Sequence, residues 1–475
     1  MINSTHYLYD RFLSMWKKVD DIIKAQNLKK YLVKLNPQDT SKENELRNDQ
    51  YFNRSVFYNV SGRTLRGFTG SIFRKQPVFE APKLLEYMKS NVDGSGVSIF
   101  QQAQKVCNDV TAKGRSGLFT TFPETEGSVK NQDIVSGRVV PTISRFAPEQ
   151  ILNWRTISDG SQVKLSLVIL HEQIEKEREQ DKYKIDLIEQ IREIFLDYER
   201  DENGEPINDN LIYKERKHQL LGGTWQVISE QVPKNGKGEN WSYIPFNFVG
   251  AKNNDVEPDL PSMIDIVDIN IAHYRNSADF EDSVYHAGQN QPWMSGLTQD
   301  HLTMMKENNI YVGSPNMLAV PEGGQFGFAK PEPNPLVRQA MQDKVEMMIS
   351  LGAKMIESGS ANKTATQVLG EREAQTSELS LIAENVSAAY MQAIKSACEY
   401  INADPEEVNF QLNTEFVNIE ASPQELQQIV AGFVQGAIPL GDYVDWMKKK
   451  GFFDEEKPVE DYSESLANVG SYGMI

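Results

Sequence analysis

Residues 261–402 constrain the fold of this chain most, because helical and strand-like patterns follow one another there in a fixed order. Pro261 suits the first turn of a helix, where a missing N–H leaves no hydrogen bond unmade. The apolar residues after it recur every four or three positions, which places them on one helical face. They are Met263, Val267, Ile271 and Tyr274. The sequence therefore predicts an amphipathic helix that begins near residue 261.

A passage rich in proline and glycine separates this helix from a second one. Strand-like segments at 291–297 and 309–313 lie in that passage. The pattern then predicts a helix over 336–356, a polar loop over 357–366 and a long helix that ends near Ile401.

Four other segments follow a consistent order along the chain. Two are rich in glycine and arginine, at 62–75 and 114–119. The others are Arg145-Phe-Ala-Pro-Glu-Gln-Ile-Leu-Asn-Trp-Arg155 and Ile244-Pro-Phe-Asn-Phe-Val-Gly250. Together with 261–402, these segments resemble the portal proteins of tailed bacteriophages over most of the chain. None of them carries chemistry, so the resemblance rests on their order.

The resemblance implies an α+β, portal-like fold with an α/β wing body, a helical stem, a small β-containing clip and a helical crown-side region. It implies these boundaries: wing, 1–255; first stem helix, 256–286; clip, 287–334; second stem helix, 335–356; tunnel loop, 357–366; long helix and return strand to the wing, 367–421; C-terminal helical crown region with a disordered acidic tail, 422–475.

The function implied by the resemblance is mechanical and not enzymatic. Portal proteins form a ring of about twelve copies at one capsid vertex. Double-stranded DNA passes through that ring, without sequence specificity, during packaging and ejection. The implied partners are the terminase large subunit, the major capsid protein and a tail adaptor, with no membrane. The implied location is the virion, after assembly in the host cytoplasm. Two alternatives stay open: another head–tail component, such as an adaptor or minor head protein, and an enzyme with a dispersed site.

Composition is ordinary for a folded chain of two to four domains, with 39% hydrophobic and 24% charged residues among 475. No stretch approaches the ~20 apolar residues that cross a bilayer. The first residues lack the basic and apolar regions of a secretory signal. Two cysteines, Cys107 and Cys398, are too few for a disulfide scaffold, and we expect both to be buried thiols.

Net charge bears on whether a protein binds DNA tightly or lets DNA slide past. The chain has 49 basic and 67 acidic residues, a net charge of −18. Tight binding to duplex DNA requires many lysines and arginines at the phosphates, which this balance disfavours. An acidic channel wall instead repels phosphate and keeps DNA from sticking. On charge alone, a need for solubility explains the acidic composition better than a DNA channel does. The charge is therefore compatible with a DNA channel but does not establish one.

No motif of catalysis, cofactor binding or metal binding is present. There is no phosphate-binding Gly-x-x-x-x-Gly-Lys-Ser/Thr loop, and no histidine has a metal-ligand spacing. His273 is expected to be a hydrogen-bonded structural imidazole. Acidic pairs on helices usually form solvated faces, although the resemblance places some of them on the stem. The candidate stem residues are Asp265, Asp268, His273, Arg338 and Lys344.

Two segments are candidate functional sites. The small polar residues of 357–366 tolerate unusual backbone angles, and the resemblance makes this segment a DNA-facing tunnel loop, whereas an ordinary interhelical loop is the alternative. Its candidates are Lys354, Ser358, Gly359, Ser360, Asn362, Lys363 and Thr364. The passage 313–335 is too apolar for a solvated loop, which favours strand pairing with an adjacent subunit. The clip and partner-contact candidates are Trp293, Met317, Phe326 and Phe328.

A basic cluster lies outside these segments. Arg63, Arg66, Arg74 and Lys75 could meet DNA or the carboxylates of a neighbouring subunit, and a mixed solvated face is at least as consistent with the sequence.

Periodicity predicts the remaining elements. Helices are expected over 8–35, 422–436 and 441–449, a mainly helical segment over 44–73, and further helix over 80–107 that Asp93-Gly-Ser-Gly interrupts. Strands are expected at 118–122, 137–143, 163–170, 223–230, 243–246 and from 408. Residues 187–198 fit neither period well, and the resemblance favours a strand at 190–196.

Overall fold

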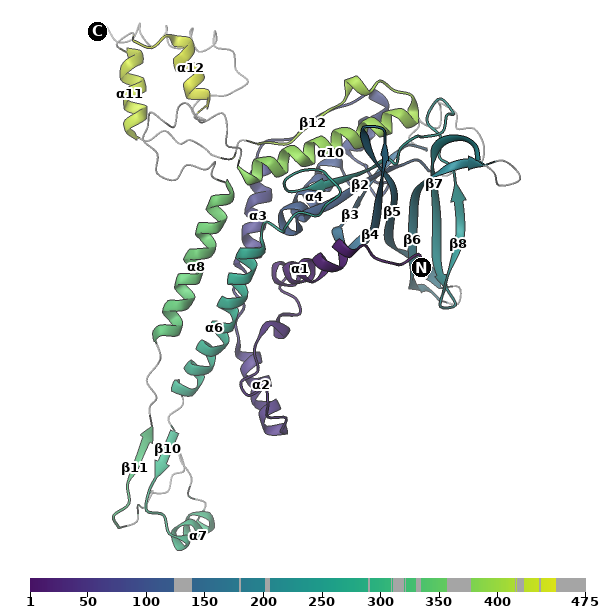
Figure 1. Cartoon of the computed structure of the whole chain (residues 1–475). Helices are drawn as coiled ribbons and strands as arrows, with labels where there is room; N and C mark the ends of the chain where they lie inside the picture. Colours follow the sequence, from purple (N-terminus) through teal and green to yellow (C-terminus); the bar gives the residue numbers. More distant parts are fainter. Residues whose placement is uncertain are drawn as a thin grey trace. The chain divides into compact units, whose positions relative to one another are not determined.

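The structure is a computed structural model that describes the following residues: 1–123, 139–178, 181–200, 206–288, 291–308, 310, 320, 322–329, 335–356, 377–414, 416, 423–434 and 437–449 (Figure 1). The chain divides into two compact units, Met1–Leu412 and Asn413–Ile475. The first unit combines helices with antiparallel sheets. The predicted α+β class is therefore confirmed. No helix in the described ranges has the length and apolarity needed to cross a membrane.

The first unit begins with the helices α1 (Tyr7–Ile23), α2 (Lys42–Arg54), α3 (Val60–Ile72) and α4 (Ile99–Lys113), with short 3₁₀ helices η1 (Leu28–Tyr31) and η2 (Lys83–Lys89) between them. Of these, α1, α3 and α4 pack on one another. Ser98 and Gln101 form a capping box that begins α4. The single helix predicted over 8–35 is wrong, because the chain leaves α1 through Ala25 and Asn27, both in the left-handed region.

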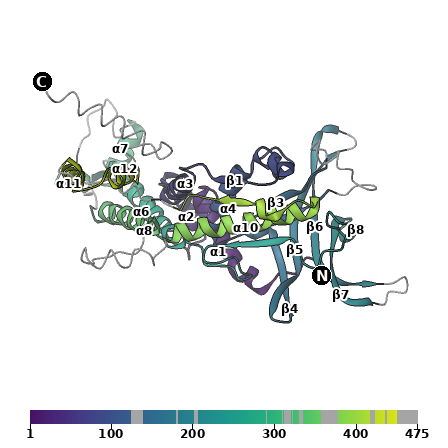
Figure 2. The same ribbon diagram turned by 90° about the horizontal axis from the view of Figure 1, so that it is seen from above.

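A three-stranded sheet lies at the centre of the unit. Its order is β3 (Thr142–Phe146), β2 (Arg115–Thr121), β9 (Phe246–Gly250). The helix α10 (Glu378–Ile401) packs on β2 and β9. It also lies along α4 (Figure 2). Thr120 Oγ1 donates to the Ala393 carbonyl oxygen at 3.0 Å. A side chain at Gly117 would meet the Phe246 ring at 2.5 Å and the Ile151 side chain at 2.9 Å, so glycine leaves room for these two core side chains.

A five-stranded antiparallel meander forms the second large sheet. Its strands run in chain order (Figure 1): β4 (Ile151–Asp159), β5 (Gln162–Arg178), β6 (Asp181–Arg200), β7 (Pro206–Leu221) and β8 (Thr224–Gln231). Trp154, Leu170 and Tyr213 of this sheet join Phe12 and Trp16 of α1 in one apolar core. The strand predicted at 190–196 is confirmed, since β6 pairs with strands on both sides.

The return of the chain after α10 closes the unit. β12 (Asn409–Gln411) pairs antiparallel with β1 (Val78–Glu80), so the strand predicted from residue 408 is confirmed.

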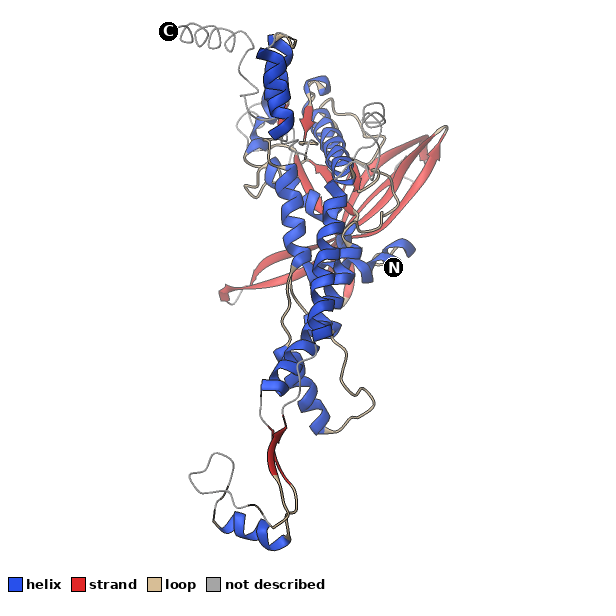
Figure 3. Cartoon of the chain, turned by 90° about the vertical axis from the view of Figure 1, so that its left-hand side faces the viewer, coloured by secondary structure: helices blue, strands red, loops and turns tan. Residues whose placement is uncertain are grey.

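Two long helices flank a smaller excursion. α6 (Ile264–Gly288) and α8 (Pro335–Ile356) lie side by side (Figures 1 and 3). Between them come β10 (Gln291–Met294), α7 (Gln299–Glu307) and β11 (Phe326–Ala329). The predicted apolar face of the first helix is confirmed: Met263, Val267, Ile271 and Tyr274 are all buried.

The second unit contains a pair of helices in its described residues. α11 (Pro423–Val434) and α12 (Leu440–Lys449) pack through Tyr443, Val444 and Met447. Both helices agree with the predictions for 422–436 and 441–449. The tail that was predicted to be disordered lies outside the described residues.

Candidate functional site

The α6–α8 pair and the excursion between them are the candidate site, because they contain the predicted stem and clip residues. α6 is held in the unit by polar contacts to the N-terminal helices. Asn270 Oδ1 accepts from the backbone N–H and the hydroxyl of Ser61, at 3.0 and 2.9 Å, and Asn270 Nδ2 donates to the Tyr58 carbonyl oxygen. Lys18 Nζ lies 2.6 Å from Asp268 Oδ1. One predicted stem carboxylate therefore pairs with α1 of its own chain.

A second set of contacts ties α2 to the last turns of α6. Arg47 donates to both oxygens of Asp282, at 2.8 and 2.5 Å, and Arg54 adds a third contact at 3.2 Å. Burial alone would raise the pKa of Asp282, but the hydrogen bonds and charge of Arg47 lower it below its ordinary value. Arg54 also lies 3.5 Å from the ring centre of Tyr285, within cation–π range.

His273 is buried on α6, but the expected hydrogen bonding is incomplete. The residue is 5% exposed, and its Nδ1 has no hydrogen-bond partner in the described part of the chain. Burial lowers the pKa of His273, and the charge of Lys344 lowers it further. A buried imidazole with this shift is neutral at pH 7, which disfavours its use as a charged contact to DNA.

The structure places the other predicted stem residues at the surface of the helices. Asp265 and Arg338 are exposed. Lys344 is half-buried, and its Nζ donates to the Ala340 carbonyl oxygen at 3.3 Å. Lys354 is exposed in the last turn of α8. The remaining tunnel-loop candidates lie outside the described residues: Ser358, Gly359, Ser360, Asn362, Lys363 and Thr364.

The predicted clip aromatics gather on one small hairpin. β10 pairs antiparallel with β11, with Trp293 opposite Gly327. A side chain at Gly327 would lie 2.9 Å from Trp293 Nε1, so the indole covers the bare backbone. Phe326 and Phe328 pack edge to face at 5.2 Å. All three aromatic residues stay exposed, at 44% for Trp293, 38% for Phe326 and 45% for Phe328.

The sequence predicted that this region pairs with an adjacent subunit. In the described residues, β11 uses one edge to pair with β10 of its own chain. Met317 lies outside the described residues.

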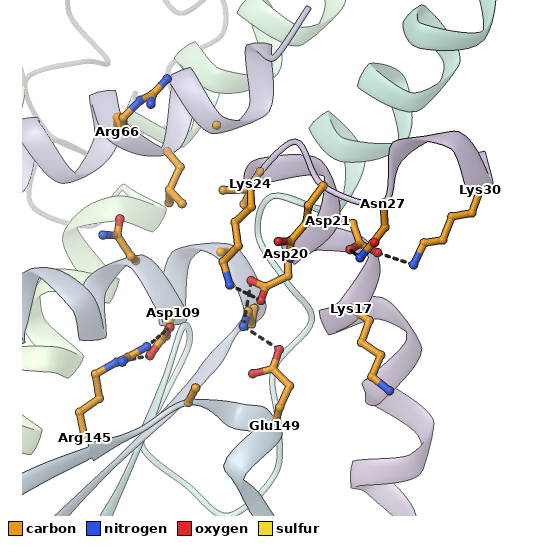
Figure 4. Close-up of a pocket in the computed structure, with 18 residues that line it drawn as sticks. Lys17, Asp20, Asp21, Lys24, Asn27, Lys30, Arg66, Asp109, Arg145 and Glu149 are labelled. Atoms are coloured by element: carbon orange, nitrogen blue, oxygen red, sulfur yellow. Dashed lines mark hydrogen bonds and ion pairs between the residues drawn. The ribbon is translucent and has the colours of Figure 1, made fainter. Parts of the chain in front are cut away.

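A polar pocket of about 760 Å³ opens between α1, α3 and α4 (Figure 4). Lys113 is 5% exposed and contacts Glu149 at 2.6 Å and Asp20 at 3.0 Å. Burial alone would lower the pKa of Lys113, but the charges of Glu149, Asp109 and Asp20 raise it. Arg145 donates to both oxygens of Asp109, at 2.6 and 2.7 Å.

The four carboxylates that line this pocket all contact cations. Asp20 also pairs with Lys24, and Asp21 pairs with Lys30. The pocket is therefore an ion-pair network that joins helices to the central sheet. Sequence reasoning missed it, because its members are far apart in the chain and follow no local motif.

The predicted basic cluster is divided in the structure. Arg66 lines the pocket, and Arg63, Arg74 and Lys75 are exposed. Arg74 and Lys75 both have contacts within the chain.

A buried cation supports the end of the central sheet nearest α4. Arg115 is 1% exposed, and burial lowers its pKa to about 9 despite the charges of Asp255 and Asp259. Its guanidinium lies 3.8 Å from the ring centre of Phe248 and 4.4 Å from that of Trp154. Nη1 donates to the Val256 carbonyl oxygen at 2.9 Å. Nε and Nη2 have no hydrogen-bond partner in the described residues. The segment that leads into α6 is thus fastened to β2.

Neither metal ligation nor a reactive thiol is evident in the described ranges. No group of three or more His, Cys, Asp or Glu residues there could hold a metal ion. Cys107 and Cys398 are free and buried, as predicted, and burial raises the pKa of both thiols, to about 11 for Cys398.

Comparisons with known proteins give limited matches. Residues 262–401 match the model of a family described as a domain of unknown function, DUF4055. No curated protein matches the chain. Solved structures that match include the neck of a native GTA (gene transfer agent) particle computed with C12 symmetry, at 10% identity and a TM-score of 0.37, covering 80% of this chain and 86% of that chain. Another is the neck of an empty GTA particle computed with C6 symmetry, at 10% identity and a TM-score of 0.37, covering 82% and 88%. A TM-score this low does not establish a shared fold.

Proposed function

We propose that this chain is the portal protein of a tailed phage-like particle. It forms a ring at one capsid vertex, serves as the channel for DNA packaging and ejection, and provides a docking platform for terminase and tail. The role is structural and not enzymatic.

One observation carries the proposal: two long helices lie side by side, a small aromatic hairpin joins them at one end, and a further long helix returns to the central sheet. This is the order that the sequence resemblance implies for stem, clip, tunnel loop and wing. α6 has 25 residues and α8 has 22. At 1.5 Å per residue they span about 37 and 33 Å, long enough for a wall that crosses a capsid shell.

The distribution of side chains supports the same assignment. Exposed aromatic residues on β10 and β11 suit a surface that meets other proteins, because such residues are enriched at interfaces. The stem also carries more apolar surface than a solvated helix needs: Leu336, Met347 and Ile349 of α8 are 74%, 53% and 62% exposed. Contacts with neighbouring copies would bury it.

The proposed division of the chain keeps the boundaries given by the resemblance. The wing is 1–255, the stem helices lie in 256–286 and 335–356, and the clip is 287–334. The tunnel loop is 357–366 and the crown region is 422–475. Terminase and a tail adaptor would meet the clip, and the major capsid protein would surround the ring.

The direct test is the mass and shape of the purified chain. Single-molecule mass measurement and negative-stain imaging should show rings of about twelve copies of the 53.9 kDa chain, with a central hole. A monodisperse monomer at high concentration, with no ring under assembly conditions, would contradict the proposal and favour an adaptor or minor head protein.

A further inference from the structure

The five-stranded sheet carries an extension in which two strands pair only with each other. Pairing of β4 with β5 ends at Leu170, and pairing of β7 with β6 begins at Gln190. Residues 171–178 of β5 and 181–189 of β6, here called the arm, therefore form a two-stranded ribbon. Such a ribbon is marginally stable alone in water, so the arm is a segment that gains from a third surface.

The two faces of the arm differ in charge and polarity. Residues directly opposite in an antiparallel pair share a face, so Glu175 lies beside Leu187 and Glu177 beside Ile185. Ile185 is 56% exposed and Leu187 is 60% exposed, and Tyr183 continues this row on β6. Among the described residues, neither Glu175 nor Glu177 forms an ion pair. This face therefore combines an exposed apolar row with uncompensated negative charge. The opposite face carries Lys176, Lys184 and Asp186.

The surface that fits this face needs exposed apolar groups beside positive charge, which is uncommon on a chain of net charge −18. Residues 28–35, here called the lysine-rich segment, provide both. Val33 is 60% exposed and Leu35 is 44% exposed. Lys34 is exposed and has no ion pair in the described part of the chain.

Two further cations lie in or beside the lysine-rich segment. Lys29 donates to the neutral amide oxygen of Asn53 at 2.7 Å, and Arg275 of α6 donates to the Tyr31 carbonyl oxygen at 2.9 Å. Both partners are uncharged, so these positive charges stay available to an acidic surface.

We propose that the arm of one copy packs against the lysine-rich segment of the next copy. This inference rests on the proposed ring. The two surfaces are different patches of the same chain, so the contact is heterologous, the kind that generates a closed ring. Ile185 and Leu187 would meet Val33 and Leu35, while Glu175 and Glu177 would face the lysines.

A cysteine pair tests the contact directly. Leu187→Cys combined with Val33→Cys should, under mild oxidation of the full chain, give a ladder of disulfide-linked copies on denaturing gels. The matched control is Val163→Cys with Val33→Cys, because Val163 is 69% exposed on the same sheet but outside the arm. The native cysteines are buried and should not form disulfides under these conditions. The control pair should give no ladder.

The outcomes separate this inference from the function it rests on. Rings without a ladder would overturn the arm contact and leave the portal proposal standing. A ladder without rings would support the arm contact and contradict the portal proposal. Monomers without a ladder would overturn both. A disulfide confined to single chains would overturn the contact between copies.

A charge reversal gives a second, independent readout. Glu175→Lys with Glu177→Lys places cations against the lysine-rich segment, and we expect the concentration for half-maximal assembly to rise about tenfold. Adding Lys29→Glu and Lys34→Glu to the same chain should restore assembly. Failure of this rescue, in a chain whose circular dichroism is unchanged, would count against the contact.

Discussion

The carboxylate of Asp282 on α6 accepts two hydrogen bonds from the guanidinium of Arg47 on α2, at 2.8 and 2.5 Å. Tyr51 of the same helix donates to Asp279 at 2.5 Å. In the described structure α2 buries Asn48 and Tyr51, and Tyr51 packs in an apolar cluster with Tyr274 and Ala278 of α6, which the partly buried Phe52 joins. Charged hydrogen bonds and this apolar cluster together hold the helix against the proposed stem.

Removing the acceptor should release α2. We expect Asp282→Ala to weaken its attachment by about 2 kcal/mol, the usual contribution of a hydrogen bond to a charged group. Hydrogen exchange of α2 amides should then be roughly 30-fold faster, while exchange in α4 is unchanged. Glu281→Ala is the matched control on the neighbouring position. Equal protection in both variants would show that apolar contacts alone hold α2.

The same carboxylate should make the attachment of α2 depend on pH. Its pKa is lowered in the folded chain, so its contribution is complete above the unfolded value of about 3.9 and is lost as pH falls through the folded value. Hydrogen exchange of α2 measured from pH 6 downward should show protection falling faster in the wild type than in Asp282→Asn. Parallel curves for the two chains would exclude this carboxylate as the cause.

Local pattern predicted the elements whose burial follows a simple period. The buried face of α6 is one example, since Met263 and its partners recur at helical spacing. The sequence pattern did not predict the end of α1, because contacts between side chains define it. Neither Ala25 nor Asn27 is an obvious breaker, but Asn27 and Tyr31 both donate to Asp21 and stabilise the turn. α7 was also missed, although Thr298 caps its first turn.

The candidate site was predictable only in outline. The exposed aromatic residues of the β10–β11 hairpin could be named because an apolar run between glycines and prolines is unusual in a solvated loop, and their role as a clip stays a prediction. The ion pairs could not, since Arg47 and Asp282 are separated by 235 positions and a charged residue does not reveal its partner in local sequence. The tunnel-loop candidates from Ser358 to Thr364 stay predictions.

Gly114 should not tolerate a side chain. It ends α4 with φ of +74°, and a Cβ there would lie 2.3 Å from the Asp259 carbonyl oxygen. We expect Gly114→Ala to destabilise the chain by at least about 2 kcal/mol, because backbone strain and displacement of the segment before α6 add together. The matched control is Gly67→Ala within α3, where no atom lies within 4 Å. That change should stabilise the helix by up to about 1 kcal/mol. Thermal unfolding of both variants checks the prediction, and similar shifts would contradict it.

The two native thiols should react slowly while the chain is folded. The thiolate is the reactive form, and a pKa of about 11 for Cys398 leaves roughly one thiolate in a thousand at pH 8. Cys107 is fully buried, and its pKa is raised as well. Iodoacetamide at pH 8 should modify neither residue in minutes, as read by intact mass, and should modify both after denaturation. Rapid modification of one thiol in the native chain would contradict its burial.

The exposed aromatic residues of the β10–β11 hairpin should contribute to partner binding by the assembled ring and not to ring formation. Replacing Trp293 and Phe328 by alanine removes large, exposed apolar side chains whose described contacts lie within the hairpin, with Gly327 and Phe326, so rings should form with unchanged mass. Binding of the terminase large subunit, the partner proposed for this hairpin, should weaken about 30-fold, since aromatic anchors at interfaces often contribute 2 kcal/mol or more. Val163→Ala, which removes an apolar group that is 69% exposed on the five-stranded sheet, should bind like the wild type. Failure of the double variant to form rings would instead show that the hairpin contacts a neighbouring copy. Strand pairing with an adjacent subunit predicts that result.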